Sequence, residues 1–198
     1  MHKPFSPACE RNRAPILSLL QKRFAHARCA LEIGSGTGQH AVHFAAALPA
    51  LCWQTSELAA NLPGIRAWLD EAGLPNTPPP LELDVQRPLP SGPWDAVFTA
   101  NTLHIMGWPE VQQLFAGLPS VLAPEAVVTV YGPFKYGGAH TSPSNAGFDW
   151  SLRADDPRRG IRDLDAVDLL ARAAGLTLIE DAEMPANNRC VSWQRTPS

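Results

Sequence analysis

The sequence predicts a single-domain α/β fold spanning residues 1–198, in which a mostly parallel seven-stranded sheet carries helices on both faces and ends in a C-terminal antiparallel hairpin. The first observation behind this prediction is that short apolar runs alternate with segments of helical periodicity. Such βα alternation is typical of parallel sheets covered on both faces. The second is that the 20 prolines, about twice the usual share, fall between these segments and mark connections.

The first half of the chain alternates helical segments with buried strands. Helices are expected over 14–25, 38–48 and 58–72, because apolar residues recur there at helical spacing, and the last is interrupted at Pro63-Gly64. Strands are expected over 28–33 and 51–55, which are apolar runs too short for helices. The order therefore begins helix, strand, helix, strand, helix.

The second half continues the alternation and closes it. Apolar runs predict strands over 81–85, 95–100 and 126–131, and a helix over 109–122 begins at Pro109, which suits a first helical turn. A helix over 163–174 ends before Gly175, and strands over 176–183 and 189–194 form the hairpin. Residues 132–162 show no regular pattern and are expected as a long structureless insert. Since long loops in compact domains are usually functional, we expect this insert on the substrate side.

Composition excludes several classes of function. A formal net charge of −3 with no long basic run gives no footprint for nucleic acid or an anionic membrane. Residues 1–15 contain no apolar secretory signal and residues 41–53 are too short an apolar stretch to span a bilayer. The cysteines lack metal-ligand or disulfide spacing; they are Cys9, Cys29, Cys52 and Cys190. We therefore expect a cytoplasmic protein with reduced thiols, a small-molecule partner and no metal.

The strongest local signal is a glycine-rich turn between a strand and a helix. Ala30-Leu31-Glu32-Ile33 leads into Gly34-Ser35-Gly36-Thr37-Gly38, and Gln39 stands where a dinucleotide fingerprint would place its third glycine. Glycines let the backbone adopt positive φ and approach a ligand closely. Glu57 ends the next strand, where a carboxylate can accept hydrogen bonds from both ribose hydroxyls of an adenosine ligand.

Together with Leu83-Asp84-Val85, these residues resemble class I S-adenosylmethionine-dependent methyltransferases, which have a Rossmann-like fold. The resemblance implies that the glycine turn lies under the methionine part of the cofactor, that Glu57 holds the ribose, and that Asp84 with Val85 reads the adenine edge. The implied cofactor-binding set is Glu32, Gly34, Gly36, Gly38, Glu57, Asp84, Val85 and Ala100. The cofactor would be S-adenosylmethionine, with S-adenosylhomocysteine as its product.

Segments outside the cofactor motifs carry a more specific resemblance, to the family of methyltransferase-like protein 26. They include Pro7-Ala8-Cys9-Glu10-Arg11-Asn12-Arg13-Ala14-Pro15, Ala100-Asn101-Thr102-Leu103-His104-Ile105, Tyr131-Gly132-Pro133-Phe134, Ser144-Asn145, Phe148-Asp149, Gly160-Ile161-Arg162-Asp163 and Met184-Pro185-Ala186-Asn187-Asn188. Glu57 departs from the more usual Asp, although its side chain still supplies two oxygens.

Catalytic candidates follow the strands whose ends meet beside the cofactor. They are Asn101 and His104 after the strand over 95–100, and Tyr131 at the end of the strand over 126–131. Residues 1–15 are a candidate lid segment over the same edge. The predicted substrate-binding set is Arg11, Asn12, Asn101, His104, Asn145, Asp149 and Arg162, whose planar or charged groups suit a small polar ligand.

Each candidate also has a structural interpretation. The glycines can serve only a strand–helix turn, Glu57 can cap a helix, and Asp84 can form a turn. His104 is equally suited to a hydrogen-bonded structural role. A structural role is favoured over metal binding for His40 and His43, which lack ligand partners at suitable spacing.

The leading hypothesis is methyl transfer from S-adenosylmethionine to a small polar metabolite by in-line displacement. Positioning and exclusion of water would supply most of the catalysis. A different class is a catalytically silent S-adenosylmethionine-binding module that regulates a partner. An NAD-dependent oxidoreductase is the third alternative, and Gln39 disfavours it.

Overall fold

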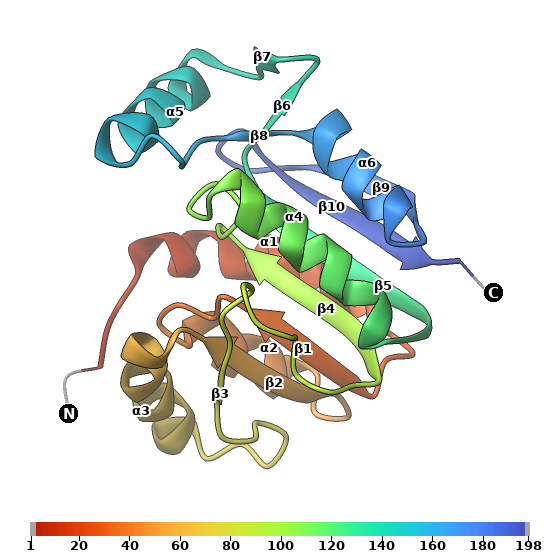
Figure 1. Cartoon of the computed structure of the whole chain (residues 1–198). Helices are drawn as coiled ribbons and strands as arrows, with labels where there is room; N and C mark the ends of the chain where they lie inside the picture. Colours follow the sequence, from red (N-terminus) through yellow and green to blue (C-terminus); the bar gives the residue numbers. More distant parts are fainter. Residues whose placement is uncertain (1–2, 197–198) are drawn as a thin grey trace.

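A computed structural model describes residues 3–196 and has one seven-stranded sheet between two layers of helices (Figure 1). The strand order is β3-β2-β1-β4-β5-β10-β9. The strands of this sheet are β1 (Cys29–Ile33), β2 (Cys52–Glu57), β3 (Leu81–Glu82), β4 (Trp94–Ala100), β5 (Leu122–Gly132), β9 (Leu176–Met184) and β10 (Asn188–Arg195). Residues 1–2 of the expected lid and 197–198 of the expected domain lie outside the described residues.

The predicted fold class is confirmed by the strand pairing. Strands β3, β2, β1, β4 and β5 pair in parallel, whereas β10 runs antiparallel to both β5 and β9. Arg189 pairs with Gly132, so the start of β10 lies beside the end of β5. The carboxyl ends of the parallel strands and the turn between β9 and β10 therefore share one edge of the sheet.

Helices α1 to α3 cover one face of the sheet, and α4 and α6 cover the other (Figure 1). The helices are α1 (Pro7–Arg23), α2 (Gln39–Ala47), α3 (Leu62–Ala72), α4 (Trp108–Gly117), α5 (Pro143–Asp155) and α6 (Leu164–Ala173). Two short 3₁₀ turns precede α3 and follow α4, at Ala59–Asn61 and Leu118–Ser120. The prolines at the starts of these helices occupy first turns, where the missing N–H removes no hydrogen bond.

The buried strand β1 explains why the sheet reads as an apolar run in the sequence. Leu31 and Ile33 pack in the core under α4 and α6, whereas Ala30 faces the core under α1 and α2. Successive side chains of a strand point to opposite faces, so both faces of a strand covered on two sides must be apolar. Trp53 on β2 and Trp193 on β10 are the largest side chains of the two cores, and both are fully buried.

The sequence predicted a helix that starts at Ala14, but helix α1 begins at Pro7. Pro15 lies inside α1. From the sequence alone, a proline favours a helix that starts near its position. The additional turns are held by tertiary contacts, because Asn12 is buried and its Oδ1 accepts a hydrogen bond of 2.7 Å from His40 Nε2 on α2. Most of the expected lid is thus the first half of a packed helix.

The segment 132–162 is ordered, and the prediction of a structureless insert is wrong. It contains β6 (Phe134–Tyr136), β7 (Ala139–His140) and α5, and β6 pairs with both β7 and β8 (Arg162–Asp163) in a second, three-stranded sheet. The Ser142 hydroxyl caps α5 by accepting the Asn145 N–H at 3.1 Å. These short elements form a cap above the sheet edge (Figure 1). The sequence shows little periodicity there because the strands are only two or three residues long, and because α5 buries the polar residues Asn145 and Asp149 while Trp150 is exposed.

Candidate functional site

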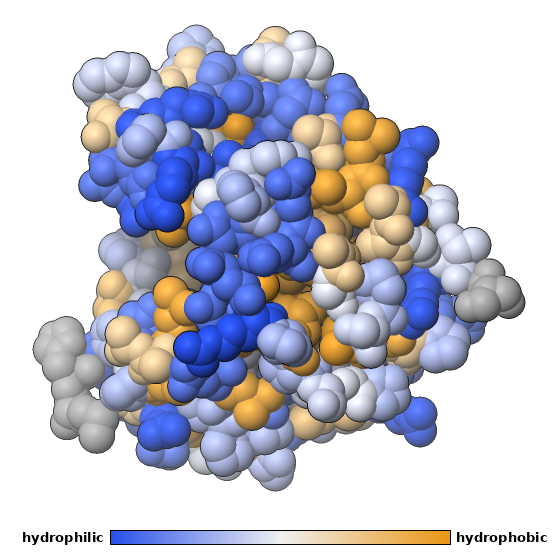
Figure 2. Space-filling view, in the orientation of Figure 1, coloured by the Kyte–Doolittle hydropathy of each residue, from blue (hydrophilic) through white to orange (hydrophobic). Residues whose placement is uncertain are grey.

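A cleft of about 1500 Å³ opens at the shared sheet edge, between the cap and the ends of the parallel strands. The space-filling view shows the surface hollowed between the regions of α5 and α3 (Figure 2). One drug-sized ligand usually occupies roughly 300–1,000 Å³. The cleft therefore has room for two small molecules side by side.

Most of the predicted site residues line this cleft. The structure brings together Arg11, Asn12, Gly34, Gly36, Glu57, Asp84, Val85, Ala100, Asn101, His104, Tyr131 and Asn145. The predicted residues that do not line it are Glu32, Gly38, Asp149 and Arg162. Parallel strand ends thus gather residues that are up to about 130 positions apart in the sequence.

The three glycines of the turn all have positive φ, but they differ in what an added Cβ would meet. A Cβ on Gly34 would lie 2.6 Å from Thr102 Oγ1, and one on Gly38 would lie 3.1 Å from Ile65 Cα. A Cβ on Gly36, whose φ is +55°, would meet no protein atom within 4 Å. Gly34 and Gly38 therefore allow close packing within the protein, whereas Gly36 keeps open a face of the cleft.

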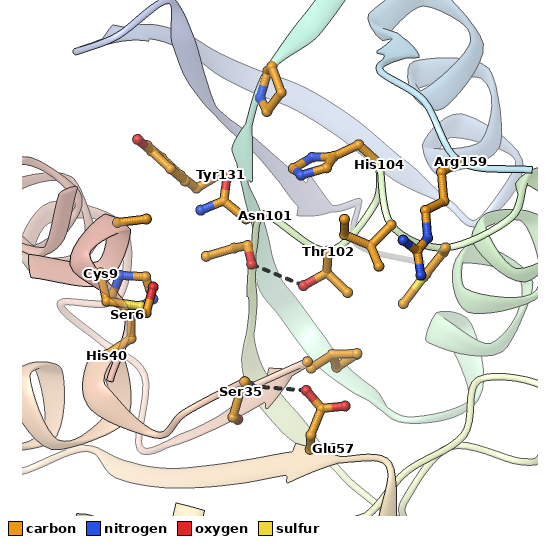
Figure 3. A pocket seen from close by; sticks show the side chains of 18 of the residues that line it. Ser6, Cys9, Ser35, His40, Glu57, Asn101, Thr102, His104, Tyr131 and Arg159 are labelled. Carbon is orange, nitrogen blue, oxygen red and sulfur yellow. Dashed lines mark hydrogen bonds between the residues drawn. The ribbon is translucent and has the colours of Figure 1, made fainter. Parts of the chain in front are cut away.

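Glu57 lies directly beside that open face. Its Oε2 accepts the Gly36 N–H at 3.0 Å and its Oε1 accepts the Leu58 N–H at 2.8 Å (Figure 3). The two backbone donors fix the carboxylate at the end of β2, and each oxygen retains a second acceptor position. The arrangement presents two oriented acceptors to a ligand resting on Gly36.

Glu32 lies beneath the turn and not in the cleft. Only 2% of the residue is exposed, and Trp53 Nε1 donates to its Oε2 at 3.0 Å. Burial raises the pKa of this carboxyl to about 7, against the smaller lowering by Trp53 and Ser35. Glu32 therefore supports the glycine turn from below and does not line the cleft as expected of a cofactor-binding residue.

Asp84 and Val85 reach the cleft from the end of β3, and Ala100 reaches it from the end of β4, with β2 and β1 lying between these two strands in the sheet order. Asp84 lies beyond the end of β3, which stops at Glu82 and not at the predicted Val85. The Asp84 carboxylate accepts the Gln86 N–H at 3.0 Å, as a turn-forming Asp does. Asp84 can therefore both form the turn and contact a ligand, because the same turn places it at the wall of the cleft.

Asn101 and His104 follow β4 and form the wall opposite the glycine turn. Asn101 has a φ of 56°, a strained backbone region for a non-glycine residue. A Cβ on Gly132 would lie 3.7 Å from His104 Nδ1 and 3.8 Å from Asn101 Oδ1, so both polar atoms border the same small space. Figure 3 shows Asn101 between Tyr131 and His104.

His104 is held as a neutral imidazole. It is 5% exposed, its ring meets Phe148 edge-on with centroids 5.4 Å apart, and burial lowers its pKa to about 4, with a further lowering by the charge of Arg162. A neutral ring can accept a proton or a hydrogen bond at neutral pH. The site therefore offers a weak base and no fixed positive charge at this point.

The N-terminal helix supplies cleft residues that the sequence did not single out. Ser6, Cys9 and His40 line the cleft close to one another (Figure 3). His40 Nδ1 is 4.0 Å from Cys9 Sγ, and burial lowers the His40 pKa to about 4. The preference for a structural role of His40 agrees with its bond to Asn12. No spacing in the sequence could indicate these contacts, because they join two helices.

The cap contributes further cleft residues that only the structure reveals. They are Phe148, Asp156, Arg158 and Arg159 from the cap, Thr102, Ile105, Met106 and Glu110 from the segment after β4, and Pro185, Ala186 and Asn188 from the turn before β10. Figure 3 shows Arg159 on the His104 side of the cleft. Arg158 and Arg159 form ion pairs with Asp156 and Asp155, respectively.

Arg162 holds the cap in place, contrary to the expectation that it contacts substrate. Its guanidinium donates to the carbonyls of Leu103 at 3.0 Å and Arg158 at 2.9 Å, and also to that of Met106. Asn145 lines the cleft, but its Nδ2 donates to Thr141 Oγ1 and to the Asn187 carbonyl, both at 2.9 Å. Both side chains therefore tie the cap to the sheet edge.

Asp149 likewise stabilises the cap and does not reach the cleft. It accepts the Ile161 N–H at 2.6 Å and pairs with Arg153 at 3.1 Å, while Lys135 and His140 lie within 4.0 Å. Burial raises the Asp149 pKa, but the Ile161 N–H and Arg153 together lower it by more. The net pKa of Asp149 therefore lies below the ordinary value.

Replacing Asp149 is expected to destabilise the protein without a direct effect on cofactor binding. Asp149→Ala leaves the N–H of buried Ile161 without an acceptor, which costs about 1–3 kcal/mol of unfolding free energy. Asp155→Ala, on the same helix and in an exposed pair with Arg159, is the control and should change stability by about 0.5 kcal/mol or less. Equal thermal shifts for the two variants would contradict this role.

Two further properties concern membranes and metals. Within residues 3–196, no helix combines the length and apolarity needed to cross a membrane. The same residues contain no group of three or more His, Cys, Asp or Glu side chains arranged to hold a metal ion.

Solved structures with the same fold include several methyltransferases. An O-methyltransferase family protein from Burkholderia thailandensis is 16% identical with a TM-score of 0.83, over 96% of this chain and 58% of that protein. The S-adenosylmethionine-dependent methyltransferase SibL is 24% identical with a TM-score of 0.79, over 95% and 55% of the respective chains. An O-methyltransferase family 2 protein from Planctomyces limnophilus, in complex with apigenin, is 15% identical with a TM-score of 0.82, over 96% and 58%.

At these identities the likeness shows the fold alone, and this chain spans a little over half the length of the three proteins. These neighbours are Rossmann-like methyltransferases, which agrees with the fold expected from the glycine turn and the strand ends. A family profile matches residues 3–195. The chain therefore belongs to the family described as protein of unknown function DUF938.

Proposed function

We propose that the protein transfers a methyl group from S-adenosylmethionine to a small polar metabolite. The observation that carries this proposal is the open face of Gly36 beside the oriented carboxylate of Glu57. A cradle that a Cβ would fill, bordered by two carboxylate oxygens, fits a ribose and the chain attached to it. The residues present thus fit the cofactor that the fold neighbours suggest.

In this proposal Gly34, Gly36 and Glu57 hold the methionine and ribose parts, and Asp84 with Val85 and Ala100 borders the adenine. Glu57, Asp84 and Glu110 line the cleft with carboxylates, and Asp156 lines it as the partner of Arg158. They complement a cofactor whose sulfonium and ammonium groups are cationic. When bound, the cofactor supplies an electrophilic methyl group on a sulfonium that is already a good leaving group.

The remaining wall would orient the methyl acceptor. Asn101 fixes the acceptor by amide hydrogen bonds, neutral His104 accepts a proton where the acceptor must lose one, and the Tyr131 hydroxyl provides a further polar contact. The cap and α1 cover the cleft and reduce the access of water, which favours an in-line displacement. The expected lid, residues 1–15, contributes through the start of α1.

The more specific resemblance to methyltransferase-like protein 26 remains part of this proposal, since its quoted segments include Asn101, His104 and Tyr131 of the cleft wall. We also propose a cytoplasmic location. All four cysteines are free thiols, as expected in a reducing compartment.

Glu57→Ala is expected to weaken the binding of S-adenosylhomocysteine by about 1–3 kcal/mol, because buried ribose hydroxyls lose their acceptors. Titration calorimetry measures the affinity. Glu82→Ala is the matched control, since Glu82 pairs with Glu57 across β3 and β2 but does not line the cleft. Unchanged affinity in a folded Glu57→Ala variant would remove the ribose assignment.

Transfer itself is tested with isotopically labelled S-adenosylmethionine and a metabolite extract. A labelled small-molecule product supports an enzyme. Binding of S-adenosylmethionine without any labelled product would instead support a silent binding module. Binding of NAD in place of S-adenosylhomocysteine would favour an oxidoreductase.

A further inference from the structure

Charge is distributed unevenly along the cleft. The lining carboxylates Glu57, Asp84, Glu110 and Asp156 come from β2, the loop after β3, α4 and the loop after α5. The lining residues contributed by α1, by the end of β5 and by the turn before β10 include no Asp or Glu. The acceptor end of the cleft is therefore free of carboxylates, unlike the end assigned to the cofactor.

Arg11 is the charged residue among these lining residues. The other lining arginines, Arg158 and Arg159, come from the cap and are paired with Asp156 and Asp155. Arg11 lies on α1, is exposed, and lines the cleft. Its neighbours Glu10 and Arg13 pair with each other at 2.9 Å, and Glu10 also accepts a hydrogen bond of 3.0 Å from Gln39. Within residues 3–196 no carboxylate forms an ion pair with Arg11, so its guanidinium remains available to a ligand.

Tyr131 adds a neutral donor to the same end. Its hydroxyl end lies toward α1, on the side away from His104 (Figure 3). Burial raises the pKa of Tyr131, while Asn12, Asn188 and the charge of Arg11 lower it, and all four residues line the cleft. Asn12 Oδ1 accepts the hydrogen bond from His40 Nε2, and both Asn12 and Tyr131 line the cleft. A protonated phenol can donate one hydrogen bond to a ligand.

We propose that the methyl acceptor is a small organic carboxylate whose carboxylate group is bound by Arg11 and the Tyr131 hydroxyl. One guanidinium and one neutral donor match a single negative charge, and a guanidinium binds a carboxylate through two parallel hydrogen bonds. A phosphate, with close to two charges, would leave charge unpaired here. The proposal rests on the proposed function, because it assigns the other end of the acceptor to Asn101 and His104.

The experiment compares carboxylates with their neutral amides. Benzoate against benzamide, and butyrate against butyramide, are titrated by ligand-observed NMR into the protein saturated with S-adenosylhomocysteine. The carboxylates are expected to bind about fivefold or more tightly than the amides, and Arg11→Gln should remove that preference. Tyr131→Phe should reduce it. Arg13→Gln is the matched control on the same helix, and it should keep the preference because Arg13 does not line the cleft.

The affinity for S-adenosylhomocysteine shows whether Arg11 binds the carboxylate of the methyl acceptor or that of the cofactor. It should stay within about twofold of the parent in Arg11→Gln, whereas a loss of about fivefold or more would show that Arg11 holds the carboxylate of the cofactor and would overturn the proposal. Equal binding of acids and amides, or no binding of either acid, would also overturn it. If S-adenosylhomocysteine does not bind at all, the proposed function fails, and the preference for carboxylates is then measured in the cofactor-free protein.

Discussion

Gly36→Val is expected to abolish measurable binding of S-adenosylhomocysteine while the protein still folds. The Cβ of this variant would project into the open face beside Glu57, where no protein atom lies within 4 Å. The valine side chain would then occupy the space proposed for the methionine and ribose parts of the cofactor. Even one extra methyl group in a packed space costs about 1–3 kcal/mol. Gly36→Ala should therefore weaken binding by about 5- to 150-fold.

Gly73 provides the matched control for backbone strain. Its φ is +58°, against +55° for Gly36, and a Cβ there also meets no atom within 4 Å. Gly73 ends α3 and does not line the cleft. Gly36→Ala and Gly73→Ala should lose similar unfolding free energy, about 1–2 kcal/mol each, but only Gly36→Ala should lose binding. Normal binding by Gly36→Ala would mean that the glycine turn serves only the fold.

Glu32→Gln is expected to stabilise the protein at alkaline pH. Burial raises the pKa of Glu32 to about 7 in the folded state from 4.5. Between these pH values the unfolded chain releases a proton that the folded protein retains, so this group's contribution to stability falls as the pH rises through 7. A shift of this size corresponds to about 3 kcal/mol of unfolding free energy. Gln keeps an oxygen for Trp53 Nε1 and carries no charge.

The difference in unfolding free energy between Glu32→Gln and the parent should thus grow from pH 4.5 to 7 and then level off. Chemical denaturation at several pH values measures it. Comparing the two proteins cancels the opposite contribution of His40 and His104, whose lowered pKa values near 4 remove stability as the pH falls. A difference that does not change with pH would show that Glu32 is ionised or solvated in the folded protein.

Much of the fold was predictable because local patterns and tertiary contacts agree over the sheet. The strand over 28–33 reads as an apolar run since β1 is covered on both faces, and Glu57 was expected where β2 ends. The start of α1 was mispredicted because Pro15 favours a helix start, whereas contacts of Asn12 with α2 extend the helix to Pro7. The cap was missed because α5 packs through polar residues such as Asn145 and Asp149, and because Arg162 holds the cap through the Leu103 carbonyl, 59 positions away in the sequence.

The sequence by itself determined the order of the strands and helices outside the cap, the glycine turn, and the placement of Glu57 and Asn101 at strand ends on the same edge of the sheet. These features depend on residues close to one another in the chain. Only the tertiary structure decided which polar residues reach the cleft. It turned Glu32, Asp149 and Arg162 inward to support the turn and the cap, and among the residues that the structure describes it left Arg11 without an ion-pair partner. The physical reason is that a polar side chain bonds the nearest partner that folding provides, and that partner is set by packing between elements and not by spacing along the chain.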